Sequence, residues 1–241
     1  MIQSTYLLPV QETMTASWDK VSGTKGSVWA AFILLFAIMF CLGFIGGMSQ
    51  YFVPTIEPGI TLLIQIIAYL LQMGMLYIGI KRAQDLPISY RMIFRTLEGM
   101  ITIRVIGLYL LQIAIFLIPI AFVCIGILLY TAQATTGMLV LCILLSVIGG
   151  MATIYLAVRM IISMAFVLDK AVGPWQAIKQ SFAATQSNFW RLVAIFLIQT
   201  LIVAISMIPL GIGLIWTVPF SLIVYGTIYK NLSLNIPTQS P

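Results

Sequence analysis

Long apolar runs separated by short polar stretches dominate this chain. Six runs can be placed, at about 27–48, 59–80, 104–130, 138–168, 191–209 and 214–229. A helix that crosses a bilayer needs about 20 mostly apolar residues, whereas a transmembrane barrel would show alternating segments of about ten. The pattern therefore predicts an all-α, polytopic membrane helical bundle, with six transmembrane helices arranged in three hairpins.

The composition agrees with a bilayer as the solvent. Of the 241 residues, 61% are hydrophobic and 7% are charged. A soluble domain of this size needs a polar outer shell, which so few polar residues could not provide. We expect a single membrane domain that covers residues 1–241.

The positive charges indicate an orientation. All twelve Lys and Arg residues lie in or beside the N-terminal arm, the second and fourth connections and the C-terminal tail. The other three connections contain none. The positive-inside rule then predicts a multi-pass protein of the bacterial inner (cytoplasmic) membrane with both termini in the cytoplasm. Because the bases form no dense stripe, we expect no nucleic-acid partner.

The chain also contains a weak internal repeat. With a shift of 87 residues, the segment 104–112 aligns with 191–199, and Pro87 aligns with Pro174. A fainter third copy begins at Pro9. These matches predict pseudo-repeats at about 9–82, 87–168 and 174–230, each made of a proline, an amphipathic stretch, a basic residue and a hairpin.

The three amphipathic stretches predict a helix before each hairpin. Their apolar residues lie on one helical face, namely Val10, Met14, Trp18 and Val21 in the first, Ile93, Leu97 and Met100 in the second, and Trp175, Ile178 and Phe182 in the third. Such helices can lie in the plane of the membrane interface. They can equally pack beneath the bundle as connectors, and the sequence leaves both interpretations open.

The fourth run is longer than a bilayer requires. Residues 138–168 would form a helix of about 46 Å, against a hydrocarbon core of about 30 Å. We expect one continuous helix that projects into the cytoplasm, with Arg159 near the lipid head groups.

Residues 169–191 resemble a known bacterial motif. Gly-Pro opens an amphipathic helix with an Ala-x-x-x-Ser pattern, and Asn-Phe-Trp introduces the next span; here these are Gly173, Pro174, Ala177, Ser181, Asn188, Phe189 and Trp190. The stretch, together with residues 224–232, is similar to YciC-like inner-membrane proteins and to membrane domains attached to some glycerophosphoryl diester phosphodiesterases. The resemblance implies a membrane fold, and it brings no catalytic residue because that chemistry belongs to a separate soluble domain.

The residue types argue against an enzyme. The chain has no histidine, and its three cysteines (Cys41, Cys124 and Cys142) lie in apolar runs without CxxC spacing. We therefore expect no catalytic, cofactor or metal site. No acid lies inside an expected span, which argues against proton-coupled transport.

Two groups of residues are candidates for function. Basic residues at the cytoplasmic ends of the spans could contact lipid phosphates: Arg104, Arg159, Lys170, Lys179 and Arg191. Gln112 and Gln199 occupy matching repeat positions and could form a polar seam in the membrane or simply join helices by hydrogen bonds. The leading hypothesis is a non-enzymatic protein that organises or binds lipid, anionic lipid included, or partner proteins, a second copy included. The alternative is an uncoupled transporter or channel for a small or lipid-like molecule.

Overall fold

The computed structural model describes residues 7–208 and 210–234, and within them it contains helices and no strand. This confirms the all-helical prediction. In chain order the elements are α1 (Val10–Asp19), α2 (Lys25–Phe52), α3 (Glu57–Ala83), the 3-10 helix η1 (Tyr90–Leu97), α4 (Gly99–Gln133), α5 (Thr136–Met160), α6 (Ser163–Lys170), α7 (Pro174–Thr185), the 3-10 helix η2 (Gln186–Asn188), α8 (Phe189–Met207) and α9 (Leu214–Ser233).

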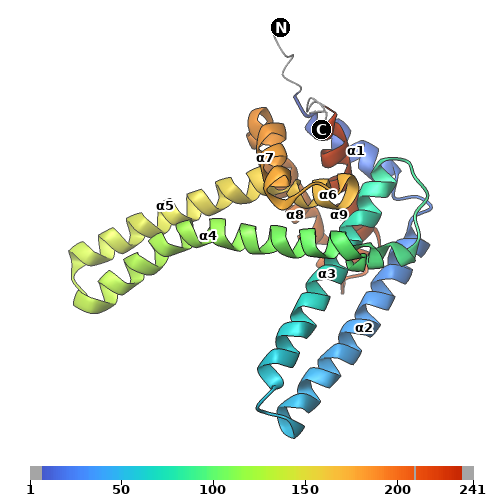
Figure 1. Cartoon of the computed structure of the whole chain (residues 1–241). Coiled ribbons are helices and arrows are strands. Elements are labelled where there is room, and N and C mark those ends of the chain that lie inside the picture. Colours follow the sequence, from blue (N-terminus) through green and yellow to red (C-terminus); the bar gives the residue numbers. More distant parts are fainter. Residues whose placement is uncertain (1–6, 209, 235–241) are drawn as a thin grey trace.

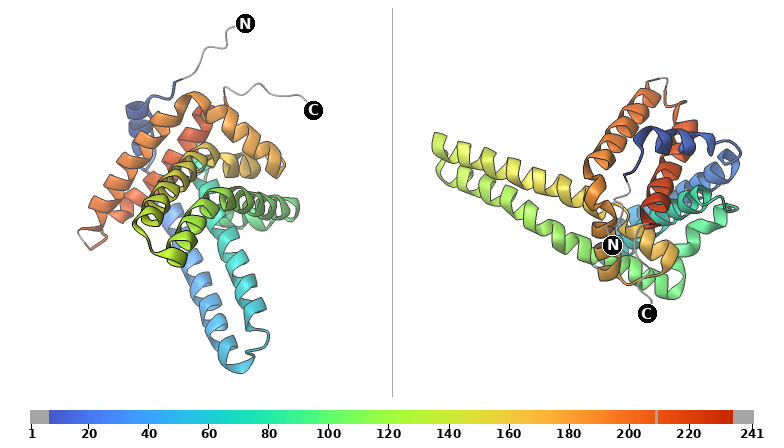
Figure 2. Two further views of the ribbon diagram at one scale, coloured as in Figure 1. Left: turned by 90° about the vertical axis from the view of Figure 1, so that its left-hand side faces the viewer. Right: turned by 90° about the horizontal axis from the view of Figure 1, so that it is seen from above.

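Three antiparallel helix pairs diverge from a common centre. We call this centre the hub; it consists of α6, α9, the end of α3 and the short elements α1, η1 and α7. The pair α2–α3 points down in Figure 1 and the pair α4–α5 points to the left. The pair α8–α9 leaves in a third direction, as both views of Figure 2 show. The three hairpins therefore point in different directions, and the contacts between them are made mainly in the hub.

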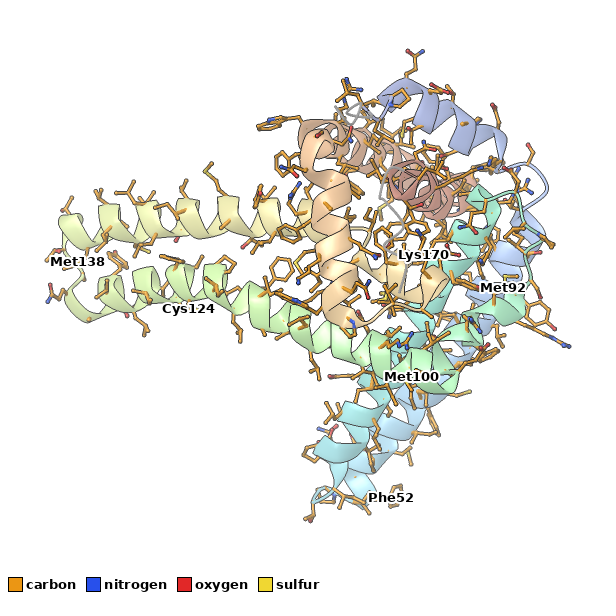
Figure 3. The ribbon with its side chains drawn as sticks, turned by 45° about the horizontal axis from the view of Figure 1, so that its top comes forward. Phe52, Met92, Met100, Cys124, Met138 and Lys170 are labelled. Atoms are coloured by element: carbon orange, nitrogen blue, oxygen red, sulfur yellow. The ribbon has the colours of Figure 1, made fainter. Side chains whose placement is uncertain are left out.

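The hairpins expose large apolar surfaces. Five helical stretches are long and apolar enough to cross a membrane: 25–52, 57–83, 99–133, 136–170 and 174–207. In the most apolar parts of 99–133 and 136–170, only 11% and 6% of the residues are buried. In Figure 3, Phe52 and Met138 lie at the far ends of two hairpins and Lys170 lies in the hub. Apolar surface of this extent is stable only against lipid or other protein, which agrees with a multi-pass membrane protein.

The sixth expected span, α9, is not among these five stretches. It has 20 residues, and it is the central helix of the hub. Its residues from Ile223 to Tyr229 are all buried. This helix therefore packs against protein along much of its length, unlike the exposed helices α4 and α5.

A close crossing of α3 and α9 holds the hub together. A Cβ atom on Gly79 of α3 would overlap the carbonyl oxygen of Leu222, and one on Gly226 of α9 would overlap the carbonyl oxygen of Gly79. Only glycine allows two helix backbones to approach this closely. Elsewhere in the spans, Gly149 lies against Pro119, whereas Gly47 and Gly150 have no neighbour within 4 Å of an added Cβ.

The fourth apolar run is divided, so the expected continuous helix over 138–168 is wrong. Helix α5 ends at Met160 and α6 begins at Ser163. The carbonyl oxygen of Arg159 accepts a hydrogen bond from the Ser181 hydroxyl (2.7 Å), and that of Met160 accepts one from Ser163 (2.6 Å). These side-chain donors replace backbone donors at the break, which allows α6 to turn into the hub.

The predicted apolar faces of the three amphipathic stretches are buried in part, at Val21, Ile93 and Ile178. The second is a 3-10 helix in which Ile93 is buried, while Leu97 and Met100 of its expected apolar face are exposed. In α1 and α7, the fully buried positions are the small residues Thr13 and Ser17, and Ala177, Ser181 and Thr185. Trp18 and Trp175 are about half exposed, at 49% and 56%. The stretches thus pack on the hub as connectors, through small residues that permit close approach.

The α3–α9 crossing yields a first prediction. Gly226→Ala should lower the free energy of unfolding by about 1–3 kcal/mol, because the added methyl group meets the backbone of α3. Thermal unfolding of the protein in detergent, followed by tryptophan fluorescence, measures the change. Gly47→Ala is the matched control and should leave the melting temperature unchanged or slightly higher, since Gly47 is exposed on a helix. Equal melting temperatures for the two variants would contradict the proposed role of the crossing.

Candidate functional site

The hub gathers charged side chains at the ends of the three returning segments, α3, α6 and α9. Asp169 at the end of α6 accepts hydrogen bonds from Lys81 of α3 (2.8 Å) and from the Tyr229 hydroxyl of α9 (2.9 Å). Gln84 donates a third, at 3.0 Å. One half-buried carboxylate thereby links all three segments, and the Lys81 ammonium group supplies its counter-charge.

A second carboxylate, that of Asp85, joins the N-terminal arm to the last turns of α9. Asp85 is within 2.7 Å of the Lys20 ammonium group and within 3.1 Å of that of Lys230. Both lysines also donate to the carbonyl oxygen of Ala83, the last residue of α3. Hydrogen bonds from Lys20 and Lys230 hold the pKa of Asp85 below its ordinary value of 3.8.

The connectors dock on returning helices through buried hydroxyl groups. The hydroxyls of Ser17 in α1 and Thr227 in α9 lie 3.0 Å apart, Thr96 of η1 donates to the carbonyl oxygen of Leu70 in α3 (2.7 Å), and Ser181 of α7 donates to that of Arg159 in α5. In the order of the three predicted repeats, each connector thus contacts the returning helix of the preceding unit. The first connector closes the ring on the last unit.

Arg159 has an unusual environment for a basic residue. It is 8% exposed, and its guanidinium lies 5.0 Å from the ring centre of Phe182 and 5.8 Å from that of Tyr155. Its Nε is buried without a hydrogen-bond partner among the described residues. A buried guanidinium without a carboxylate is costly unless an anion approaches it, so this is the best candidate binding site.

The other candidate bases occupy different environments. Lys170 and Lys179 are exposed and lie over the rings of Phe166 (5.5 Å) and Trp175 (5.4 Å). Arg191 donates to the carbonyl oxygen of Leu8 (2.9 Å), so it anchors the N-terminal arm. Arg104 is half-buried and forms no ion pair with a described acid.

Among the residues that the structure describes, four of the twelve bases form ion pairs (Lys20, Lys81, Arg95 and Lys230). The remaining eight have no carboxylate of a described residue within 4 Å. The hub therefore carries excess positive charge.

The two glutamines have different surroundings. Gln112 donates to the Ser163 hydroxyl (3.0 Å), near the break between α5 and α6. It lines an apolar pocket of about 260 Å³ on one side of α4, together with Tyr109 and Phe116. Gln199 in α8 forms no hydrogen bond with a described residue. The structure thus gives each glutamine its own environment and no shared polar seam between them.

Sequence reasoning missed most of the hub. It treated Asp85 and Asp169 as loop acids, and it did not single out Thr13, Ser17 or Thr185. One signal was available, because hydroxyl residues spaced four apart in α1 (Thr13 and Ser17) and α7 (Ser181 and Thr185) form a small, polar face that suits close packing. The described residues contain no cluster of three or more metal-ligating His, Cys, Asp or Glu side chains.

Comparisons with known proteins add no family assignment. No protein-family model, curated protein or solved structure matches the chain.

The Asp85 ion pairs predict a pH dependence. Because the pKa of Asp85 is lowered in the folded protein, its contribution to stability is fully present above pH 3.8 and is lost as the pH falls through the lower folded-state value. Asp85→Asn should therefore lower the melting temperature at neutral pH and have no effect at the acidic end of the titration. Asp19→Asn removes an exposed acid that pairs with no described base and serves as the control. A constant difference between Asp85→Asn and the unchanged protein at every pH would refute the linkage.

Proposed function

We propose that this chain is a non-enzymatic, multi-pass protein of the bacterial cytoplasmic membrane that binds and organises anionic lipid at its hub. The membrane-spanning hairpins anchor the hub at the cytoplasmic surface, with both termini in the cytoplasm. The placement of all twelve bases in or near the hub supports this orientation. The resemblance of residues 169–191 to inner-membrane families supports the same assignment.

The observation that carries the proposal is the buried Arg159 guanidinium, which pairs with no carboxylate of the described residues. Its planar group offers donors in a fixed fork, which suits two oxygens of one phosphate. The site lies where α5 leaves its hairpin and enters the hub, and the exposed bases Lys170 and Lys179 belong to the two elements that follow. These surroundings favour a lipid phosphate at Arg159, with the exposed bases attracting anionic head groups at longer range.

The alternative, an uncoupled transporter or channel, has less support. The pocket beside Gln112 is apolar and is lined by residues of one helix. Partner proteins, including a second copy of the chain, are compatible with the exposed hairpins, but no contact in the structure favours one of them.

A lipid-dependent stability measurement tests the proposal. Adding phosphatidylglycerol to the protein in neutral detergent should raise its melting temperature, because a ligand that binds the folded state stabilises it. Arg159→Gln should remove most of this increase. Loss of a charged hydrogen bond costs about 1.5–3 kcal/mol, which corresponds to roughly 10- to 150-fold weaker binding.

Three controls make the result specific. Arg91→Gln removes an exposed base outside the candidate set and should keep the increase. Arg159→Lys keeps the charge but loses the fork, so it should give an intermediate response. Phosphatidylcholine tests whether any lipid raises the melting temperature, and inorganic phosphate tests whether any phosphate does. Neither should match the increase given by phosphatidylglycerol. A full increase in Arg159→Gln would show that Arg159 does not hold the lipid.

A further inference from the structure

The turn between α8 and α9 lies beside the beginning of α2. The Lys25 ammonium group is 4.9 Å from the centre of the Trp216 ring, and the indole nitrogen of Trp29 donates a hydrogen bond to the carbonyl oxygen of Ile215 (3.1 Å). Lys25 is the first residue of α2, and Trp216 is the third residue of α9. The turn end of the α8–α9 hairpin therefore contacts the first turns of α2.

This contact fixes how deep the turn can lie. Helix α2 has 28 residues, enough to cross the bilayer, so Lys25 marks the membrane surface at which the chain enters. Gly211 in the turn is five residues from Trp216, so their Cα atoms are at most about 18 Å apart even in a fully extended chain. The hydrocarbon core is about 30 Å thick. These contacts therefore place the turn nearer to the membrane surface marked by Lys25 than to the opposite surface.

Helix α1 lies along the same hairpin and carries charge. At one end, the Leu8 amide donates to the Asn188 side-chain oxygen (2.7 Å), and at the other the Trp18 ring packs edge-on against Phe220 (5.4 Å). Glu12 and Asp19 of α1 are exposed. If α8 and α9 crossed the bilayer, α1 would carry these two carboxylates into or beside the hydrocarbon, where an unpaired charge is costly.

The rest of the hairpin surface is apolar. Leu197, Leu201 and Ile205 recur every fourth residue along α8 and are each more than 60% exposed. Leu210 in the turn is 96% exposed. The hairpin thus has charged α1 against one part of its surface and an uncovered apolar face elsewhere. An element that lies in the membrane interface needs this combination.

We propose that the α8–α9 hairpin does not cross the membrane but lies in the leaflet on the hub's side, with its apolar face in the acyl chains of that leaflet. The chain then has four crossing helices, α2 to α5, and its third hairpin is a surface for one lipid leaflet. This goes beyond the proposed head-group site, since it stands whether or not Arg159 binds phosphate. It also leaves both termini on the hub's side, as six crossings would.

Thiol labelling from one side of the membrane tests the arrangement. In the full-length protein with its three cysteines replaced by alanine, a short Gly-Ser-Cys-Ser-Gly insertion is placed after Gly211. Matched insertions after Ser22, beside α2, and after Thr55, in the α2–α3 turn, mark the two surfaces. A membrane-impermeant maleimide is applied to intact cells and then to opened membranes.

In intact cells we expect the insertion after Gly211 to respond as the one after Ser22 does and opposite to the one after Thr55, and in opened membranes we expect all three to be labelled. A response in intact cells that matches Thr55 would overturn the proposal, and so would protection in both states, which would place the turn inside the bilayer. The comparison is relative, so it remains valid even if the predicted orientation of the whole protein is reversed.

A second measurement identifies what covers the apolar face. A fluorophore on Leu201→Cys, in the cysteine-free protein reconstituted into phosphatidylcholine vesicles, is quenched by lipids that carry a nitroxide at a known depth. Stronger quenching by a nitroxide near the head group than by one at the chain end is expected for an interfacial helix. Stronger quenching by the deep nitroxide would indicate a crossing helix, and no quenching would indicate a second copy of the chain; either result contradicts the proposal.

Discussion

The crossing of α3 and α9 at Gly79 and Gly226 is the contact on which the rest of the structure depends. It brings the end of the first hairpin against the last helix of the chain, with the backbones in direct contact. Lys81, Ala83 and Asp85 follow Gly79 closely, and Tyr229 and Lys230 follow Gly226, so the contacts of both carboxylates form within one or two helical turns of this crossing. A side chain larger than hydrogen at either glycine would push these groups apart.

The hub and the hairpins are stabilised by different contacts. Inside the hub, buried hydroxyl groups and two carboxylates join the connectors and the returning helices. The hydroxyl contacts form a closed ring: η1 contacts α3, α7 contacts α5, and α1 contacts α9. Outside the hub, the two helices of each hairpin, α2 with α3 and α4 with α5, mainly contact each other (Figure 2). The surrounding lipid must supply the remaining contacts. The hairpins therefore depend on the bilayer, whereas the hub is held by the protein itself.

Charge and apolar surface are segregated in a way that suits a membrane surface. Eight bases that pair with no carboxylate of the described residues lie in or beside the hub, and Arg159 is the one among them that is buried. The connectors place their tryptophans, Trp18 and Trp175, partly outward. In the proposed function, anionic lipid offers both a phosphate for Arg159 and an interface for the aromatic rings.

The sequence by itself determined the helical class, the membrane environment and the approximate positions of the apolar runs, because these follow from composition and from hydrophobic length, which are local properties. It also located Arg159 as the basic residue inside an apolar run. It did not determine the break between α5 and α6, the 3-10 form of η1, the burial of α9 or the two carboxylate clusters. Each of these depends on partners far away in the chain, such as Ser181 for the carbonyl oxygen of Arg159 and Gly79 for Gly226. A hydrophobic pattern records that a helix must be covered by something apolar, and only the tertiary structure decides whether lipid or another helix covers it.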